Sequence, residues 1–280
     1  MRRRAYLALF ALVILVLIGG CTSSVDSGTD ASVAATGEQL RISGSGTCLP
    51  LVHILSEEYP GNAEFVYLPG LHSGGGIEGV ANGDLEIGAV SRELSEDEAA
   101  LGLDYVALSD DGLVIAVHPS VTIDGLTTQQ VRDIYAGKYS DWAELGGEDA
   151  PITILDRNED ESAKIILRQY VLGSDLEITP KAVNLYYESD MIEGLQSTVG
   201  AIGYFSLGQG LSQDVPVRYL ELDGVAATVD NILNGSYKMV RPLGVVTAST
   251  PSADIAAFLE WATSSEVAEL MKSRGFAPAK

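Results

Sequence analysis

Basic residues are scarce in this sequence of 280 residues, where Lys and Arg number 17 against 39 Asp and Glu and the formal charge is -22. Such a chain lacks the basic face that neutralises nucleic-acid phosphates, so nucleic-acid binding is excluded. Two cysteines cannot form a disulfide framework, and no two of the three histidines stand at a metal-ligand spacing. The nucleophile-elbow string Gly-x-Ser-x-Gly of many serine hydrolases is absent as well. The sequence therefore gives no support to serine-hydrolase catalysis, to a metal site or to a bound cofactor.

The composition is nevertheless that of a folded globular protein. Hydrophobic residues make up 46% of the chain and charged residues 20%, which is enough apolar material for a sizeable core. The 30 glycines and 10 prolines indicate many turns, and no repeat of fixed period appears. Length alone allows either one large domain or two lobes.

The start of the chain resembles a bacterial lipoprotein signal. Arginines at positions 2–4 precede the apolar stretch Ala5–Ile18, which is shorter than the roughly 20 residues of a transmembrane helix. Gly19-Gly20-Cys21 follows, and small residues before a cysteine are typical of a lipobox; a retained signal anchor is the alternative. We expect residues 1–20 to be removed, Cys21 to be lipidated, and the protein to be anchored at the extracytoplasmic face of the membrane. The small polar residues up to position 37 are expected to form a flexible tether.

Beyond the tether, short apolar segments alternate with helical patterns, which predicts an α/β fold. The expected strands are residues 40–43, 64–68, 85–89, 105–108, 113–117, 152–155, 201–205, 217–220 and 243–247. The expected helices are residues 49–59, 76–82, 128–136, 162–171, 191–198, 228–233 and 252–272.

Three expected strands run into segments that share one chemistry. Gly44–Cys48, His72–Gly76 and Asp156–Lys164 each lie between a strand and a helix, and each carries Gly, Ser or Thr. Glycines let the backbone approach an anion, and hydroxyls and the free N–H groups of a helix start donate hydrogen bonds to it. Arg157 would add a bidentate, charge-assisted pair. Together the three segments predict a site for a small oxyanion.

At these positions the sequence resembles the phosphate-binding proteins of bacterial and archaeal ABC importers, the shorter lipoprotein branch of the type II periplasmic-binding-protein fold. The stretches that carry the resemblance are Ser43–Thr47 with Leu49–Leu51, Ser73–Ile77, Asp84–Leu94, Leu126–Thr127, Ile134–Lys138 with Trp142, Gly146–Gly147, Val199–Tyr204, Asn234–Tyr237 and Arg241–Leu243. They cover nearly everything after the tether. The resemblance implies two α/β lobes around a ligand cleft, with lobe 1 at residues 38–117 and 239–280 and lobe 2 at residues 118–238.

The resemblance also implies a function and a set of binding residues. The expected function is capture of inorganic phosphate between the lobes and its delivery to an ABC permease by a monomer with no catalysis of its own. The implied ligand-binding residues are Thr47, Cys48 through its N–H, Ser73, Gly74, Ser91, Arg92, Arg157 and Ser162.

Two departures from the family pattern leave the ligand open. Some members place an aspartate where Ser91 stands, and that carboxylate accepts the proton of hydrogen phosphate and repels sulfate. After the lobe 2 arginine the family has Ser-Gly-Thr, whereas Glu161-Ser162-Ala163 stands here and puts an acid beside the site. Glu161, Glu159 or Asp160 would supply an acceptor from the other lobe, or would complement the dipole of the helix start. The alternatives are binding of another oxyanion such as sulfate, and an anion sensor without transport.

Three further motifs have competing interpretations. Cys48 at a helix start is either a reactive thiol or a small buried side chain. His72 either lines the cleft as a pH-sensitive group or is structural. Gly74–Gly79 matches the dinucleotide fingerprint Gly-x-Gly-x-x-Gly, but no convincing nucleotide-binding unit surrounds it.

Overall fold

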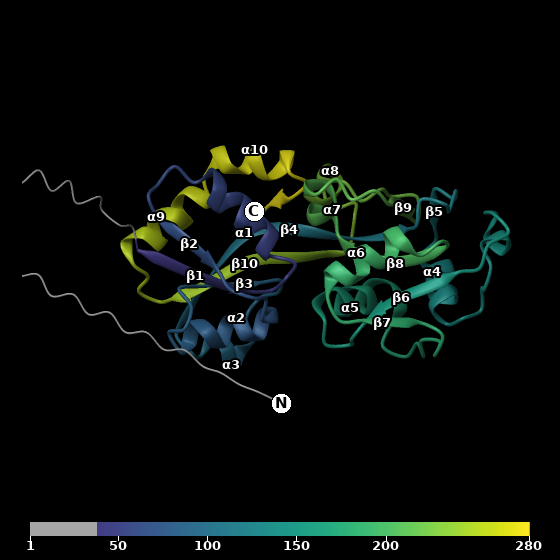
Figure 1. The fold of residues 1–280 in the computed structure, drawn as a ribbon, viewed down its shortest axis with the longest axis horizontal. Helices are drawn as coiled ribbons and strands as arrows, with labels where there is room; N and C mark the ends of the chain where they lie inside the picture. The colour runs from purple at the N-terminus through teal and green to yellow at the C-terminus, as the bar shows by residue number, and fades with distance from the viewer. Residues whose placement is uncertain (1–37, 280) are drawn as a thin grey trace, which may run out of the picture. The chain divides into compact units, whose positions relative to one another are not determined.

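The computed structural model describes residues 38–279, so the predicted signal sequence, the lipidation site at Cys21 and the tether lie outside the described residues. The described residues form an α/β protein built on one sheet whose main strand order is β2-β1-β3-β10-β4-β8-β6-β7. The elements fall into two groups, which Figure 1 shows at the two ends of the long strands β4 (Leu103–Val117) and β10 (Val240–Ala248). The predicted α/β class is confirmed.

The first group of elements, lobe 1, has a parallel core of strands in which β1 pairs with both β2 and β3. Its buried side chains form one cluster that includes Leu40, Val52 and Phe258 from three separate elements. Its elements are β1 (Gln39–Gly44), α1 (Leu49–Glu58), β2 (Glu64–Tyr67), α2 (His72–Ala81), β3 (Ile87–Val90), α3 (Glu96–Ala99), α9 (Ala253–Ala262) and α10 (Ser265–Ser273).

The second group, lobe 2, is built on β8 and the parallel pair that β8 forms with β6. It has its own buried cluster, which contains Trp142, Tyr204 and Phe205. Its elements are β5 (Gly125–Leu126), α4 (Thr128–Tyr135), η1 (Trp142–Leu145), β6 (Thr153–Arg157), α5 (Ser162–Leu167), η2 (Arg168–Leu172), β7 (Val183–Leu185), α6 (Glu188–Ser197), β8 (Ala201–Ser206), α7 (Leu207–Ser212), β9 (Arg218–Leu222) and α8 (Val229–Leu233).

Strand β4 connects the two lobes because it changes partners along its length. Residues 103–112 pair antiparallel with β10, and residues 113–117 pair antiparallel with β8. The short strand β11 (Ala277–Pro278) returns the end of the chain to β4 at Asp110 and Ser109. The chain therefore passes between the lobes on β4 and β10, and the predicted lobe boundaries remain proposals.

The segment after β2 differs from its predicted form. Helix α2 begins at His72, so the residues expected to form a loop before the helix make up its first turn. Glycine is a poor helix former, but Gly76 packs against the backbone of β1, where an added Cβ would lie 3.0 Å from Gly44 Cα. Gly44 itself has φ +132 and would place a Cβ 2.2 Å from the Ala89 carbonyl oxygen. Close packing of the helix on the strands therefore outweighs the low helix propensity.

Two other segments also differ from expectation. The two strands predicted at residues 105–108 and 113–117 are one continuous strand, β4. The helix predicted at residues 252–272 is two helices, because Ser264 begins α10 and its hydroxyl accepts a hydrogen bond from the N–H of Val267. Within residues 38–279, no helix is long and apolar enough to span a membrane.

Candidate functional site

A polar cleft of about 590 Å³ lies between the two lobes. Lobe 1 contributes small and hydroxyl-bearing residues to its lining, and lobe 2 contributes an arginine, several acids and two tyrosines. The lining residues are Ser45, Gly46, Thr47, Pro69, Gly70, His72, Ser73, Gly74, Gly75, Ser91 and Arg92 from lobe 1, and Arg157, Asn158, Asp160, Glu161, Ser162, Ile165, Tyr186, Tyr187 and Glu188 from lobe 2.

Arg157, the last residue of β6, is the buried cation of this cleft. The residue is only 4% exposed, and its Nη2 atom donates to the Tyr186 carbonyl oxygen at 2.9 Å and lies 2.9 Å from Glu161 Oε2. Its Nε and Nη1 atoms are buried without a hydrogen-bond partner among the described residues. Buried guanidinium donors are costly to leave unpaired, and each of them can donate a hydrogen bond to an anion. Arg157 therefore has two donor atoms that no described residue satisfies.

A buried network below the cleft fixes the backbone of Arg157. The Lys164 Nζ atom, on the fully buried side chain of α5, lies 2.6 Å and 2.5 Å from the two carboxylate oxygens of Asp156. Tyr204 donates its hydroxyl to Asp156 at 2.8 Å and accepts the Arg157 N–H at 3.1 Å. Burial and the adjacent Asp156 charge raise the pKa of the Tyr204 hydroxyl well above its ordinary value, which keeps that hydroxyl a donor. The arginine is thus held in place before any ligand arrives.

Four serine hydroxyls from both lobes meet at Ser91. Ser91 Oγ lies 3.0 Å from Ser45 Oγ and 3.3 Å from Ser73 Oγ in lobe 1, and 2.9 Å from Ser162 Oγ in lobe 2. The Ser91 N–H also donates to Ser73 Oγ at 3.1 Å. Hydroxyl protons rotate freely between acceptors, so this cluster can turn its donors toward an anion without moving its oxygens.

Three backbone N–H groups of the loop after β1 are used in hydrogen bonds within the protein. The N–H groups of Ser45, Thr47 and Cys48 donate to the Ala89 carbonyl, the Ser45 hydroxyl and the Ser45 carbonyl respectively. Cys48 lies outside the cleft lining, and its thiol donates to the Gly244 carbonyl. Burial raises the pKa of that thiol to about 12, which argues for the buried side chain and against the reactive nucleophile. The binding role of the Cys48 N–H stays a prediction, and the loop lines the cleft with Ser45, Gly46 and Thr47.

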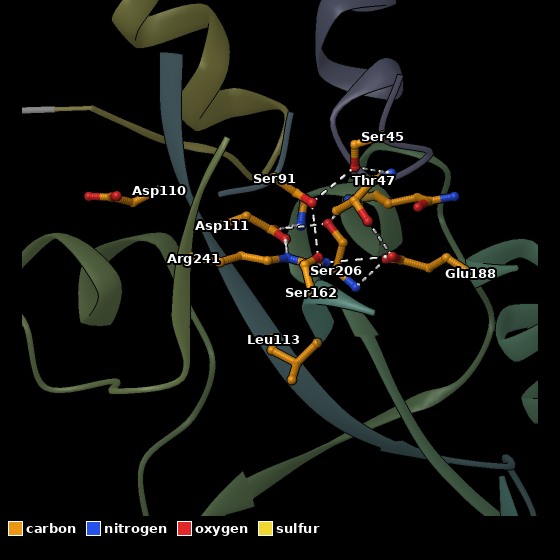
Figure 2. A network of polar contacts seen from close by, with 12 residues as sticks. Ser45, Thr47, Ser91, Asp110, Asp111, Leu113, Ser162, Glu188, Ser206 and Arg241 are labelled. Carbon is orange, nitrogen blue, oxygen red and sulfur yellow. Dashed lines mark hydrogen bonds and ion pairs between the residues drawn. The ribbon is translucent and has the colours of Figure 1, made fainter. Parts of the chain in front are cut away.

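Two cleft-lining residues, Thr47 and Glu188, form a direct contact between the lobes, which Figure 2 shows as a dashed line. The Thr47 hydroxyl of lobe 1 donates to Glu188 Oε2 at the start of α6 at 2.5 Å, and Glu188 Oε1 accepts the Ser206 N–H at 2.8 Å. The carboxylate is buried, so these two donors and the nearby Arg241 satisfy it. Glu188 therefore ties the first loop of lobe 1 to lobe 2.

Arg241 of β10 lies beneath the cleft and contacts three elements at once. The residue is 1% exposed, and its Nη1 atom donates to Ser162 Oγ at 2.8 Å. Its Nε atom pairs with Asp111 Oδ2 of β4 at 3.2 Å, and its Nη2 atom lies 3.5 Å from Glu188 Oε2. Burial, with a further contribution from Glu188, raises the pKa of Asp111. Arg241 thus joins the crossing strands to a serine of the cleft.

Arg92 lies at the cleft but is engaged elsewhere. Its two terminal nitrogens donate to the Glu98 carboxylate at 2.6 Å and 2.7 Å, and this pairing lowers the pKa of Glu98 to about 2. A ligand at Arg157 would compete with a well-formed ion pair for Arg92.

The structure brings most of the predicted residues together. Seven of the eight predicted ligand-binding residues line the cleft, namely Thr47, Ser73, Gly74, Ser91, Arg92, Arg157 and Ser162. Asp111, Glu188 and Arg241, which contact one another beneath the cleft, are not among the binding residues predicted from sequence. For two of them the sequence does hold a signal, because Asp111 and Arg241 are charged residues within or beside apolar strand segments. Across residues 38–279, no group of three His, Cys, Asp or Glu side chains is placed to hold a metal ion.

Two lobes joined by paired crossing strands, with a polar cleft between them, define a solute-binding protein. A family model described as a PBP superfamily domain matches residues 29–266, and the chain belongs to that superfamily. The predicted type II periplasmic-binding-protein fold is thereby confirmed.

Several known proteins are similar to this chain over most of its length. The phosphate-binding protein PstS of Bacillus subtilis is 25% identical over 291 residues, covering 99% of this chain and 94% of the relative. A protein of Clostridium perfringens assigned as a phosphate ABC transporter substrate-binding protein, solved with bound phosphate, is 28% identical with a TM-score of 0.77; the match covers 87% of this chain and all of that one. An ABC-type phosphate transport receptor of Vibrio cholerae is similar in fold, with 24% identity, a TM-score of 0.61, and 85% and 99% of the two chains covered.

Proposed function

We propose that this protein captures inorganic phosphate in the cleft between its lobes and supplies it to an ABC importer. The observation that carries the proposal is the Arg157 guanidinium, which is buried at the cleft with Nε and Nη1 unpaired among the described residues. A buried cation with open donors is stabilised by an anion of matching geometry. The names of the relatives point to the same ligand.

Binding draws on both lobes. The anion accepts hydrogen bonds from Arg157 of lobe 2 while the hydroxyls clustered on Ser91 turn toward it. Ser162 of lobe 2 and Ser45 of lobe 1 both lie within hydrogen-bond distance of Ser91, so one small anion can be reached from the two sides. A ligand held in this way stabilises the closed arrangement of the lobes, because neither lobe alone supplies all the donors. The protein is a binding protein and catalyses no reaction.

Delivery and location follow from the family and from the start of the chain. We assign an ABC permease as the partner that receives phosphate from the closed protein. Lipidation of Cys21 anchors the protein at the extracytoplasmic face of the membrane, and it acts there as a monomer. The support for these assignments is the lipobox-like Gly19-Gly20-Cys21 sequence and the ABC-transport names of the similar proteins.

Calorimetric titration of the purified protein, stripped of bound anion, tests the proposal. We expect phosphate to bind with one site per chain and a micromolar or lower Kd, roughly -8 kcal/mol or more favourable. A dicarboxylate serves as the control for nonspecific attraction to arginine. Absence of phosphate binding, or tighter binding of the dicarboxylate, would contradict the proposal.

A further inference from the structure

Ser162, the first residue of α5, accepts two hydrogen bonds at the edge of the cleft. The Arg241 Nη1 atom donates to Ser162 Oγ at 2.8 Å, and the Ser91 hydroxyl donates to the same oxygen at 2.9 Å, as the dashed lines in Figure 2 show. A serine hydroxyl has one proton to donate and two lone pairs with which to accept. The two donors therefore use both lone pairs of Ser162, and its proton takes part in neither bond.

The Ser162 proton cannot turn back toward Arg241. A guanidinium carries only donors and stays protonated throughout the pH range in which proteins are folded. Ser91 can rotate its hydroxyl toward a ligand, but the Arg241 donor remains in place whichever way Ser91 turns. Since Ser162 lines the cleft, its proton is available to an anion that enters there.

Two buried carboxylates fix the direction in which Arg241 donates. Its Nε atom pairs with Asp111 Oδ2 at 3.2 Å, and its Nη2 atom lies 3.5 Å from Glu188 Oε2. These contacts hold two of the three guanidinium nitrogens, so the third, Nη1, is aimed at Ser162 before a ligand arrives. A donor arranged in advance loses little conformational freedom when the anion binds.

The other hydroxyls around Ser91 accept from neutral groups. Ser45 Oγ accepts the Thr47 N–H, and Ser73 Oγ accepts the Ser91 N–H. A hydrogen bond from a cation is stronger than one from a neutral amide, and it polarises the hydroxyl that receives it. Among these described serines, Ser162 is therefore the one whose O–H is strengthened as a donor by a buried charge.

We propose that Arg241 is a positioning residue for phosphate binding: it occupies the Ser162 oxygen as a donor and so directs the Ser162 proton toward an anion in the cleft. The proposal rests on the proposed function and adds to it a residue that is not part of the cleft lining. Arg241 acts on the ligand through one hydroxyl and makes no contact with the anion itself.

A double-mutant cycle on the phosphate Kd, measured by calorimetric titration, tests this role. Arg241→Lys keeps a charge near Asp111 and Glu188, but one ammonium cannot replace three guanidinium nitrogens. We expect Arg241→Lys to weaken binding about tenfold in the wild type but about twofold or less in Ser162→Ala, because the hydroxyl through which Arg241 acts is then gone. Equal losses in the two backgrounds, or no loss in the wild type, would overturn the proposal, since a purely structural effect of Arg241 does not depend on the Ser162 hydroxyl.

Ser73→Ala is the matched control background. It removes a hydroxyl that contacts Ser91, as Ser162 does, but that does not bond to Arg241. We expect Arg241→Lys to keep its effect there to within about threefold. If Ser73→Ala cancels the effect of Arg241→Lys as fully as Ser162→Ala does, the assignment to Ser162 is overturned.

The wild-type protein provides a second test that holds even if circular dichroism shows that Arg241→Lys does not fold. In a crystal structure with phosphate, we expect Ser162 Oγ to lie within hydrogen-bond distance of both Arg241 Nη1 and a phosphate oxygen. A phosphate held by Arg157 that Ser162 does not contact, or a Ser162 hydroxyl that has left Arg241, would overturn the role of Arg241 and leave phosphate capture standing. A wild type that binds no phosphate would instead overturn the proposed function.

Discussion

Replacing Arg157 with alanine is expected to weaken phosphate binding by about 2 to 4 kcal/mol, or roughly 30- to 700-fold in Kd. The reason is that the arginine supplies the buried donors that no described residue satisfies, so the variant would hold the anion without its cation. Arg157→Lys should recover only part of the loss, because an ammonium keeps the charge but not the planar fork. Calorimetric titration measures each Kd, and circular dichroism verifies that the variants fold.

Arg92→Ala is the control for this prediction. Arg92 also lines the cleft and carries the same charge, but its guanidinium is paired with Glu98. We expect Arg92→Ala to weaken the free energy of phosphate binding by about 1 kcal/mol or less. The reason is that Arg92 is partly exposed and stays paired with Glu98 when the ligand binds. An Arg157→Ala protein with wild-type affinity, or one that loses less than Arg92→Ala, would remove Arg157 from the site.

Replacing Arg241 with methionine is expected to lower the free energy of unfolding by about 3 to 5 kcal/mol. Methionine fills much of the volume but leaves Asp111 and Glu188 buried near one another without a cation. Urea unfolding followed by circular dichroism measures the change. The double variant Arg241→Met/Asp111→Asn should recover part of the lost stability, because it removes one of the two uncompensated charges.

Arg41→Met provides the comparison for Arg241. Arg41 pairs with Glu86 at 2.6 Å, but its side chain is 41% exposed, so Arg41→Met should lower the free energy of unfolding far less than Arg241→Met does. If Arg41→Met and Arg241→Met lower the free energy of unfolding equally, the buried ion pairs of Arg241 do not stabilise the fold in the way described.

The alternation of strands and helices was predictable because it depends on local hydrophobic patterns. The predicted strand at residues 201–205 and the predicted helix at 128–136 each match an element of the structure to within one residue at either end. In such segments the spacing of the apolar residues follows the period of a strand or a helix, so the local sequence alone identifies the element.

The secondary-structure predictions were wrong where contacts between residues far apart in the sequence outweigh the local conformational preference. Ser109–Gly112 has the composition of a turn, but Asp111 pairs with Arg241, which lies 130 positions further along the chain, and the strand continues. The glycines after His72 favour a loop, but they lie in a helix in which the small size of Gly76 allows α2 to approach β1.

For the candidate site, too, the local sequence predicted some features, whereas others depend on long-range contacts. Hydroxyl and arginine residues next to strand ends were predictable, since strand ends of an α/β sheet gather at one edge. The sequence did not indicate that the Cys48 N–H donates to the Ser45 carbonyl within its own loop, and the binding role of that N–H stays a prediction. Nor did it show that Glu188 and Arg241 meet, because that contact joins helix α6 to strand β10, which are far apart in the sequence.

A crystal structure of the protein with phosphate tests the central claim most directly. The account predicts one phosphate in the cleft, with its oxygens within hydrogen-bond distance of Arg157 Nε or Nη1 and of serine hydroxyls from both lobes. A phosphate bound at another place, with the two Arg157 nitrogens still unpaired, would contradict it.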